Sequence, residues 1–167
     1  MSVTITRIDV DAMLGDAAMK LAEMIKKLTV EGVLAANKER VVPEMPLRIG
    51  LVASPQTEGY KDFLGQLDRS GLAFEVTVVP TTVQGDSAPP AIVNAIETLD
   101  ALSLDLICVI RGGGSKADLA CFDDEGVART IGTASTPIWT GIGHTGDTSV
   151  ADMAANYYAI TPTELGV

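Results

Sequence analysis

The chain has 167 residues, the length of one ordinary domain, so it can bury about 70% of its unfolded surface. Its composition, 47% hydrophobic and 20% charged, excludes a disordered tail, a coiled-coil rod and a disulfide-dense secreted module. The 12 basic and 22 acidic residues give a net charge of −10, which opposes nucleic-acid binding unless basic side chains are locally concentrated.

Residues 10–28 carry apolar side chains at every third or fourth position, which predicts an amphipathic helix. Its apolar stripe packs either on the following domain or on a partner. Two prolines in residues 38–46 indicate a linker. We therefore expect an N-terminal helix and linker over 1–46 and one compact domain over 47–167.

Four short, β-branched apolar runs follow, at 47–54, 73–80, 105–111 and 137–142. Continuous apolar runs are typical of parallel strands covered on both faces, and the segments between them are long enough for crossover helices. Ser87 suits the N-cap of the second crossover helix. A last helix is expected over 148–156, followed by an extended 158–161. This order predicts a doubly wound, mainly parallel α/β sheet of Rossmann-like or flavodoxin-like type with helices on both faces.

No targeting or membrane segment is predicted. No window reaches about 18 uninterrupted apolar residues, and the start MSVTITRIDV lacks the order of a signal peptide. Cys108 and Cys121 lie in apolar contexts without metal-ligand spacing, so we expect buried, reduced thiols. The protein is therefore expected to be cytoplasmic and free of the membrane.

In a sheet of this class, ligands bind beyond the carboxyl ends of the strands, where the polar residues of this chain gather. Ser54 follows the first strand, and RGGGS at 111–115 follows the third. The glycines and Ser115 would let backbone N–H groups approach an anion, and buried Arg111 would need an anionic partner. The motif predicts a phosphate site formed by Arg111 and by Gly112, Gly113, Gly114 and Ser115. A tight turn without a ligand is the alternative.

GIGHTGD at 141–147 places the only histidine, His144, at a glycine-rich strand exit, with Asp147 three residues later. The carboxylate could orient the imidazole and leave its other nitrogen to exchange a proton. A surface histidine beside a helix-capping Asp147 is the alternative. Asp62 could face the crevice if its helix starts near Thr57, or it could be solvated.

Other features indicate structural roles or exclude chemistries. FDDE at 122–125 resembles a metal-binding carboxylate cluster, but consecutive helix positions point in different directions, so it is interpreted as a solvated helix face. Trp139 is interpreted as a core residue. No G-x-S-x-G elbow is present, which argues against acyl transfer. The remaining arginine, histidine and carboxylates suit displacement at a phosphodiester or phosphoryl group.

The ordered motifs RGGGS-x-x-DL-x-x-F-x-DE-x-VAR and G-x-GH-x-x-D resemble the large-subunit family of bacterial exodeoxyribonuclease VII, over residues 30–163. The resemblance implies hydrolysis of single-stranded DNA from its ends to oligonucleotides with 5′-phosphates, in DNA catabolism and repair. It also implies many copies of a small helical subunit as partner. A homo-oligomer is a further possible assembly, which the sequence does not decide. The family's catalytic residues fall on Asp62, Arg111, His144 and Asp147. No metal ligand is assigned, although family members differ in their need for Mg²⁺.

The chain also departs from this family. Such subunits normally carry an OB-like N-terminal domain and a long helical C-terminal region, so the chain is expected to represent the catalytic core alone. Thr145 stands where the family usually has glutamate, and residues 112–167 carry two bases against seven acids. These features predict weak DNA affinity and low activity in isolation. They leave a non-catalytic phosphate- or nucleotide-binding module, or an assembly core, as alternatives.

Overall fold

The computed structural model describes residues 10–112, 116–143 and 148–167. Its elements in chain order are α1 (Val10–Val30), α2 (Val33–Ala36), the 3₁₀ helix η1 (Asn37–Glu39), β1 (Arg48–Ala53), α3 (Glu58–Arg69), β2 (Glu75–Pro80), α4 (Ala88–Asp100), β3 (Leu106–Ile110), the 3₁₀ helix η2 (Lys116–Asp123), α5 (Glu125–Thr133), β4 (Ile138–Gly141), α6 (Val150–Ala154), β5 (Tyr157–Ala159) and α7 (Pro162–Leu165).

The strands form one sheet in the order β2-β1-β3-β4-β5, and every pairing is parallel. This is the flavodoxin-type order of a doubly wound sheet. The predicted α/β fold is therefore confirmed. The order reverses between β1 and β3, which is the point where ligands bind in sheets of this kind.

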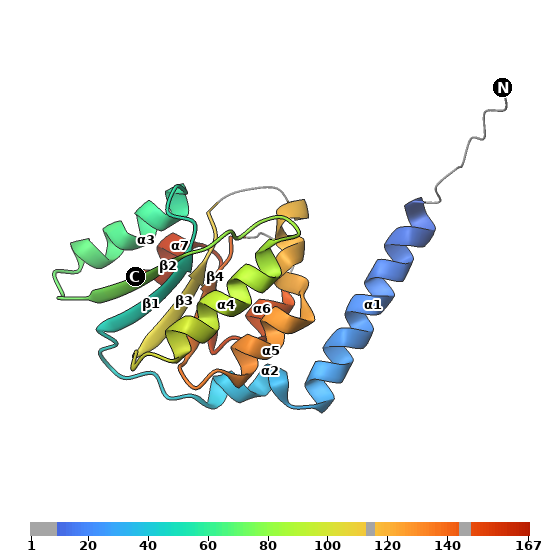
Figure 1. The fold of residues 1–167 in the computed structure, drawn as a ribbon, viewed down its shortest axis with the longest axis horizontal. Helices are drawn as coiled ribbons and strands as arrows, with labels where there is room; N and C mark the ends of the chain where they lie inside the picture. The colour runs from blue at the N-terminus through green and yellow to red at the C-terminus, as the bar shows by residue number, and fades with distance from the viewer. Residues whose placement is uncertain (1–9, 113–115, 144–147) are drawn as a thin grey trace, which may run out of the picture.

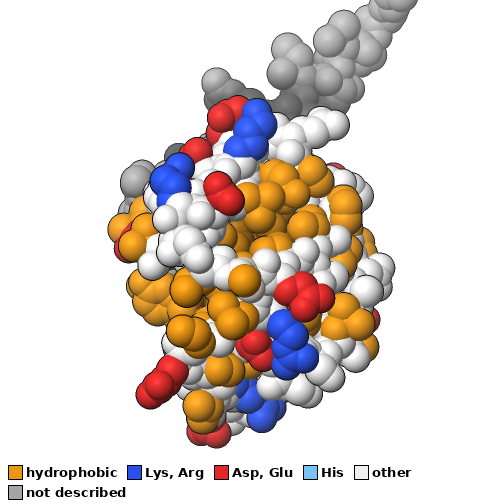
Figure 2. All heavy atoms as spheres, turned by 90° about the vertical axis from the view of Figure 1, so that its left-hand side faces the viewer, with side chains coloured by type: hydrophobic (Ala, Val, Ile, Leu, Met, Phe, Trp, Pro, Cys, Tyr) orange, Lys and Arg blue, Asp and Glu red, His pale blue; other side chains and the backbone are white. Residues whose placement is uncertain are grey.

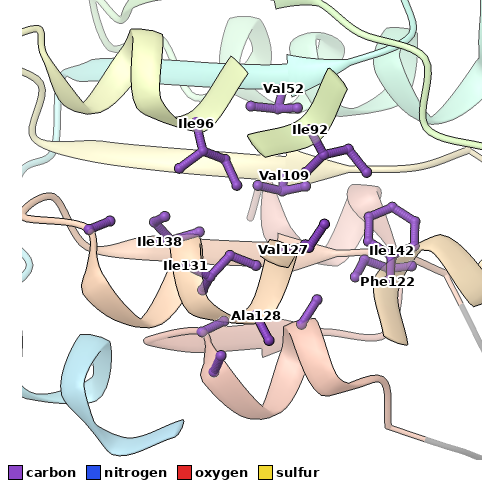
Figure 3. Close-up of a cluster of buried hydrophobic side chains, with 14 of the residues drawn as sticks. Val52, Ile92, Ile96, Val109, Phe122, Val127, Ala128, Ile131, Ile138 and Ile142 are labelled. Carbon is purple, nitrogen blue, oxygen red and sulfur yellow. The ribbon is translucent and has the colours of Figure 1, made fainter. Parts of the chain in front are cut away.

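Helices cover both faces of the sheet (Figure 1). Because side chains alternate along a strand, Ile107 and Val109 of β3 point toward α4 and α5, while Cys108 and Ile110 point toward α3. The larger cluster lies on the α4 and α5 face, where side chains of both helices meet those of the strands (Figure 3). Burial of these apolar side chains supplies the main stabilisation of the domain.

Helix α1 confirms the predicted amphipathic helix but packs along only part of its length. Leu28 is fully buried, and Leu21, Met24 and Ile25 pack against the larger cluster. Residues 13–20 are exposed, and α1 stands away from the sheet (Figure 1). Only the C-terminal part of the apolar stripe therefore packs on the domain.

The predicted linker contains ordered structure. Asn37 is fully buried: its amide donates to the Thr136 carbonyl at 3.1 Å, and its Oδ1 accepts from the N–H of Ile138 at 2.8 Å. Asn156 Nδ2 donates to the carbonyls of Asn37 and Arg40 at 2.8 and 2.9 Å. Residues 37–40 are thus tied to β4 and β5, and the division of the chain at residue 47 stays a prediction.

Several local expectations are refined. Thr57 is the N-cap of α3 and Ser87 that of α4, although Ser87 makes no side-chain capping bond. The expected third crossover helix divides into η2 and α5, and the expected extended segment is the edge strand β5. Helix α7 was not predicted, because four residues carry too little periodicity.

Both cysteines are buried thiols, as predicted, and burial raises the pKa of the Cys108 thiol. None of the helices in the described part of the chain is both long and apolar enough to cross a membrane. Figure 2 views the side that carries α3 and β2, where hydrophobic side chains gather among charged ones. Half-buried members of the smaller cluster, including Leu64 and Val78, lie on these two elements.

Candidate active site at the strand order reversal

The candidate site lies where β1 and β3 end side by side. Ser54 directly follows β1, and Arg111 directly follows β3. Their neighbouring positions confirm that these two predicted site residues lie at the same edge of the sheet. The side chain of Ser54 is half-buried, and its carbonyl accepts the N–H and the hydroxyl of Thr57.

The start of α3 lies directly on the backbone of Gly112. A Cβ added to Gly112 would lie 2.8 Å from Cβ of Thr57, and one added to Gly59 would lie 2.8 Å from Cα of Gly112. Only glycines permit this approach, because real Cβ atoms are not found so close to other heavy atoms. The positive end of the α3 dipole therefore borders Gly112, the first glycine of RGGGS, where it favours negative charge.

Arg111 is buried, with only 2% of its surface exposed. Its backbone N–H donates to the carbonyl of Gly141 at 3.1 Å, which extends the pairing of β3 with β4. A buried guanidinium must be matched by acceptors or an anion, because desolvation of a charge is costly. The expected burial of Arg111 is confirmed, and its five N–H donors in a planar fork suit phosphate geometry.

Gly143, in the second glycine-rich segment at 141–147, lies close to the backbone of Arg111. It adopts φ of 77°, a left-handed conformation that favours glycine, and a Cβ there would lie 3.5 Å from the Arg111 carbonyl oxygen. The residues that precede 113–115 and 144–147 are therefore neighbours. Gly113, Gly114, Ser115, His144 and Asp147 lie outside the described residues, and their roles stay predictions.

Asp62 lies in the second turn of α3 and is exposed. It is three residues after Gly59 and four before Gln66, so these three positions share one flank of the helix. Added Cβ atoms at Gly59 and Gly166 would approach Pro162 and Gln66 at 2.9 Å, which identifies this flank as the one against α7. Asp62 thus follows the helix start that contacts Gly112.

A polar cavity of about 420 Å³ extends the site beyond β1 and β2. It is lined by Ser54, Pro55, Gln56, Pro80, Thr81 and Thr82. Its hydroxyl and amide groups could hydrogen-bond a sugar or base, and none of the lining side chains that the structure describes is charged.

Sequence reasoning missed a buried carboxylate beside the site. Asp152, 2% exposed, accepts a 2.6 Å hydrogen bond from the hydroxyl of Thr140 and a 2.8 Å bond from that of Ser149. Ser149 and Asp152 also form a capping box at the start of α6. The spacing Ser-x-x-Asp before an apolar run was the available signal. This network fixes α6 against β4.

The FDDE motif is not simply a solvated helix face, so that prediction is wrong. Asp123 and Asp124 are half-buried and accept the N–H groups of Val150 and Val127, each at 3.0 Å. Carboxylates serve this way because helix starts leave N–H groups without backbone partners. Within the described ranges, no three His, Cys, Asp or Glu side chains are grouped as a metal site would require.

Comparison with known proteins identifies the chain's relatives. The family model "Exonuclease VII, large subunit" matches residues 33–166. An exodeoxyribonuclease 7 large subunit of Pseudomonas aeruginosa (strain LESB58) is 41% identical over 151 residues, which cover 89% of this chain and 33% of the relative. Those of Stutzerimonas stutzeri (strain A1501) and Azotobacter vinelandii are also 41% identical, with the same coverage. The chain thus spans about a third of the length of these curated relatives.

Proposed function

Because the chain belongs to the exonuclease VII large-subunit family, we propose that it is the catalytic core of a nuclease that hydrolyses single-stranded DNA from its ends. Oligonucleotides with 5′-phosphates are the products. The family match does not favour the alternative of a non-catalytic nucleotide-binding module or assembly core. A small helical subunit is the proposed partner, the cytoplasm the proposed location, and DNA catabolism and repair the proposed context.

The observation that carries this proposal is the burial of Arg111 between the starts of two glycine-rich segments. Arg111 adjoins Gly112, and Gly143 lies against its carbonyl at the carboxyl edge of the sheet. A buried arginine at this edge, directly before a glycine that contacts the N-terminus of α3, supports binding of a phosphodiester. In the proposed reaction, Arg111 and the N–H groups of 112–115 stabilise the charge on the phosphorus-bound oxygens.

Proton transfer in this reaction is assigned to His144, whose imidazole is oriented by Asp147. A water oxygen bonds to phosphorus, the bond from phosphorus to O3′ breaks, and the proton lost by water is balanced by one gained at O3′. His144 acts either as the base that accepts the first proton or as the acid that supplies the second. Asp62 positions the water, the histidine or an ion. If Mg²⁺ takes part, it would supply further charge stabilisation, and carboxylates such as Asp62 would hold it.

The test uses end-labelled single-stranded DNA, the chain and its small-subunit partner, each with and without EDTA. Replacing His144 with alanine should lower the cleavage rate by about 100-fold or more, since general acid–base catalysis contributes at least that factor. Thr145→Ala is the matched control from the adjacent position and should cleave at close to the parental rate. Parental cleavage by His144→Ala would refute the assigned role, and the EDTA arm reports whether a divalent ion takes part.

A further inference from the structure

We infer that a groove along the free edge of β5 binds a nucleotide of the single-stranded DNA that the candidate site cleaves. The inference rests on the proposed function for the identity of the ligand. The groove has a volume of about 530 Å³, within the range of small-molecule sites. It is lined by Lys38, Thr148, Asp152, Met153, Ala155, Asn156, Tyr157, Tyr158 and Ile160.

Tyr158 supplies an aromatic wall. It pairs with Thr140 across β4 and β5, and the Thr140 hydroxyl bonds to Asp152 of α6, so Tyr158 lies on the α6 face of the sheet. Tyr157 points to the other face, where its ring packs edge-on against Trp139 at 5.3 Å between centroids. Tyr158 is 47% exposed, and within the described ranges no aromatic ring packs against it. Its ring is therefore available to stack on a base.

Lys38 supplies the positive charge. Asn156 holds the backbone on both sides of Lys38 through its bonds to the carbonyls of Asn37 and Arg40. Lys38 is exposed and makes no ion pair with any residue that the structure describes. Among the lining residues that the structure describes, the one acid, Asp152, is buried and hydrogen-bonded. In a chain of net charge −10, a groove whose described lining has an exposed cation and no exposed acid complements a phosphate.

One end of the groove lies close to Gly143 of the candidate site. Thr148 directly follows residues 144–147 in the sequence, and it lines the groove. At the same end, a Cβ added to Gly143 would lie 4.0 Å from the Ile160 carbonyl oxygen, and Ile160 is another lining residue. A strand whose phosphate lies at Arg111 could therefore continue past Ile160 and Tyr158 toward Lys38. An aromatic platform and a cation along one track are the features that bind single strands without sequence preference.

The first test follows the backbone N–H resonances of the ¹⁵N-labelled full chain during titration with a thymidine hexanucleotide at low salt. We expect saturable shifts at Lys38, Met153, Tyr158 and Ile160. Shifts confined to other residues, or none at millimolar oligonucleotide, would overturn the inference. Changes at these resonances that depend on protein concentration without oligonucleotide would assign the groove to a second copy of the chain, and would also overturn it.

The second test compares variants by the affinity for a fluorescent thymidine oligonucleotide. Tyr158→Ala should weaken binding roughly five-fold or more, as expected for loss of one stacked base, while Tyr158→Phe should retain affinity. Lys38→Gln should weaken binding and reduce the slope of log affinity against log salt by about 0.7. Lys26→Gln, an equal charge change at an exposed position of α1, is the matched control. Equal affinities of Lys38→Gln, Lys26→Gln and the parent would exclude the phosphate contact.

Cleavage assays with the small-subunit partner separate this inference from the proposed function. If the parent cleaves DNA and both Tyr158→Ala and Lys38→Gln bind and cleave equally well, the groove assignment fails and the nuclease proposal stands. If the oligonucleotide shifts the groove resonances but no assembly hydrolyses it, the nuclease proposal fails and the groove stands.

Discussion

Asp152 is a buried carboxylate that hydrogen bonds stabilise in this fold. Its carboxylate is 2% exposed, so each oxygen must be matched by hydrogen-bond donors. Thr140 serves one oxygen, and the hydroxyl and N–H of Ser149 serve the other. Hydrogen bonds to charged groups contribute more than neutral ones, so the Thr140 hydroxyl is expected to stabilise the domain measurably.

Thr140→Val tests this bond because valine keeps the shape of the side chain and removes the donor. We expect the free energy of unfolding, measured by urea denaturation, to fall by about 1.5–3 kcal/mol. Thr98→Val is the control, since the Thr98 hydroxyl is exposed and bonds to a carbonyl of its own helix. Its effect should stay within about 0.5 kcal/mol. Equal effects of the two substitutions would show that the Asp152 bond contributes no more than a surface hydroxyl.

At the scale of elements, the contact between α2 and α5 depends on the absence of a side chain. A Cβ added to Gly132 of α5 would overlap the backbone oxygen of Val33 at the start of α2. Backbone atoms cannot move aside as a flexible side chain can, so α2 would have to shift. The same element leads into Asn37, whose buried amide holds the start of β4. Packing of α2 on α5 therefore also positions the segment that carries Lys38.

Gly132→Ala should lower the free energy of unfolding by about 1–2 kcal/mol, because overpacking outweighs the gain in helix propensity. Gly65→Ala in α3 is the matched control, since its added Cβ meets only the mobile guanidinium of Arg69, at 3.4 Å. That variant should be neutral or more stable by up to about 1 kcal/mol. Thermal unfolding of both variants provides the measurement. A gain in stability from Gly132→Ala would contradict the prediction, because it would mean that α2 shifts to accommodate the added methyl group at little cost in free energy.

At the scale of the whole molecule, α1 is attached to the domain at one end. Leu28 is fully buried in the larger cluster, and Lys27 and Glu31 form ion pairs with Glu125 and Arg129 of α5. Residues 13–20 are exposed along the rest of the helix. Within α1, only the C-terminal end should therefore contribute to the stability of the domain.

Removal of residues 1–18 should leave the unfolding midpoint of the domain unchanged, because the described residues in this range bury little apolar surface. Leu28→Ala should instead reduce the free energy of unfolding by about 2–5 kcal/mol through loss of buried surface and formation of a cavity. Urea denaturation of both proteins measures the unfolding midpoint and the free energy of unfolding. A large loss of stability in the shortened chain would contradict the attachment at one end.

The placement of Ser54 and Arg111 at one edge of the sheet could be predicted from the sequence because parallel strands bring their carboxyl ends together. The apolar runs before Ser54 and Arg111 indicated β1 and β3, and the glycines after them indicated close backbone approach. Asp62 was undecided from its spacing, and the structure places it on the exposed flank of α3 beside α7. Spacing along a helix identifies the residues that share a face but not the element that covers that face.

The sequence by itself determined the class of fold, the strands and the polar residues at their ends, since these follow from local periodicity and from residue chemistry. The tertiary structure alone decided the strand order, the pairing of β5, the burial of Asn37 and the groove between Tyr158 and Lys38. All of these features join residues that are distant in the sequence: Tyr157 of β5 pairs with Trp139 of β4, and Asn37 bonds to Ile138 and Asn156, about 100 or more positions away. No local pattern encodes such pairings, because they depend on which surfaces the folded chain brings together.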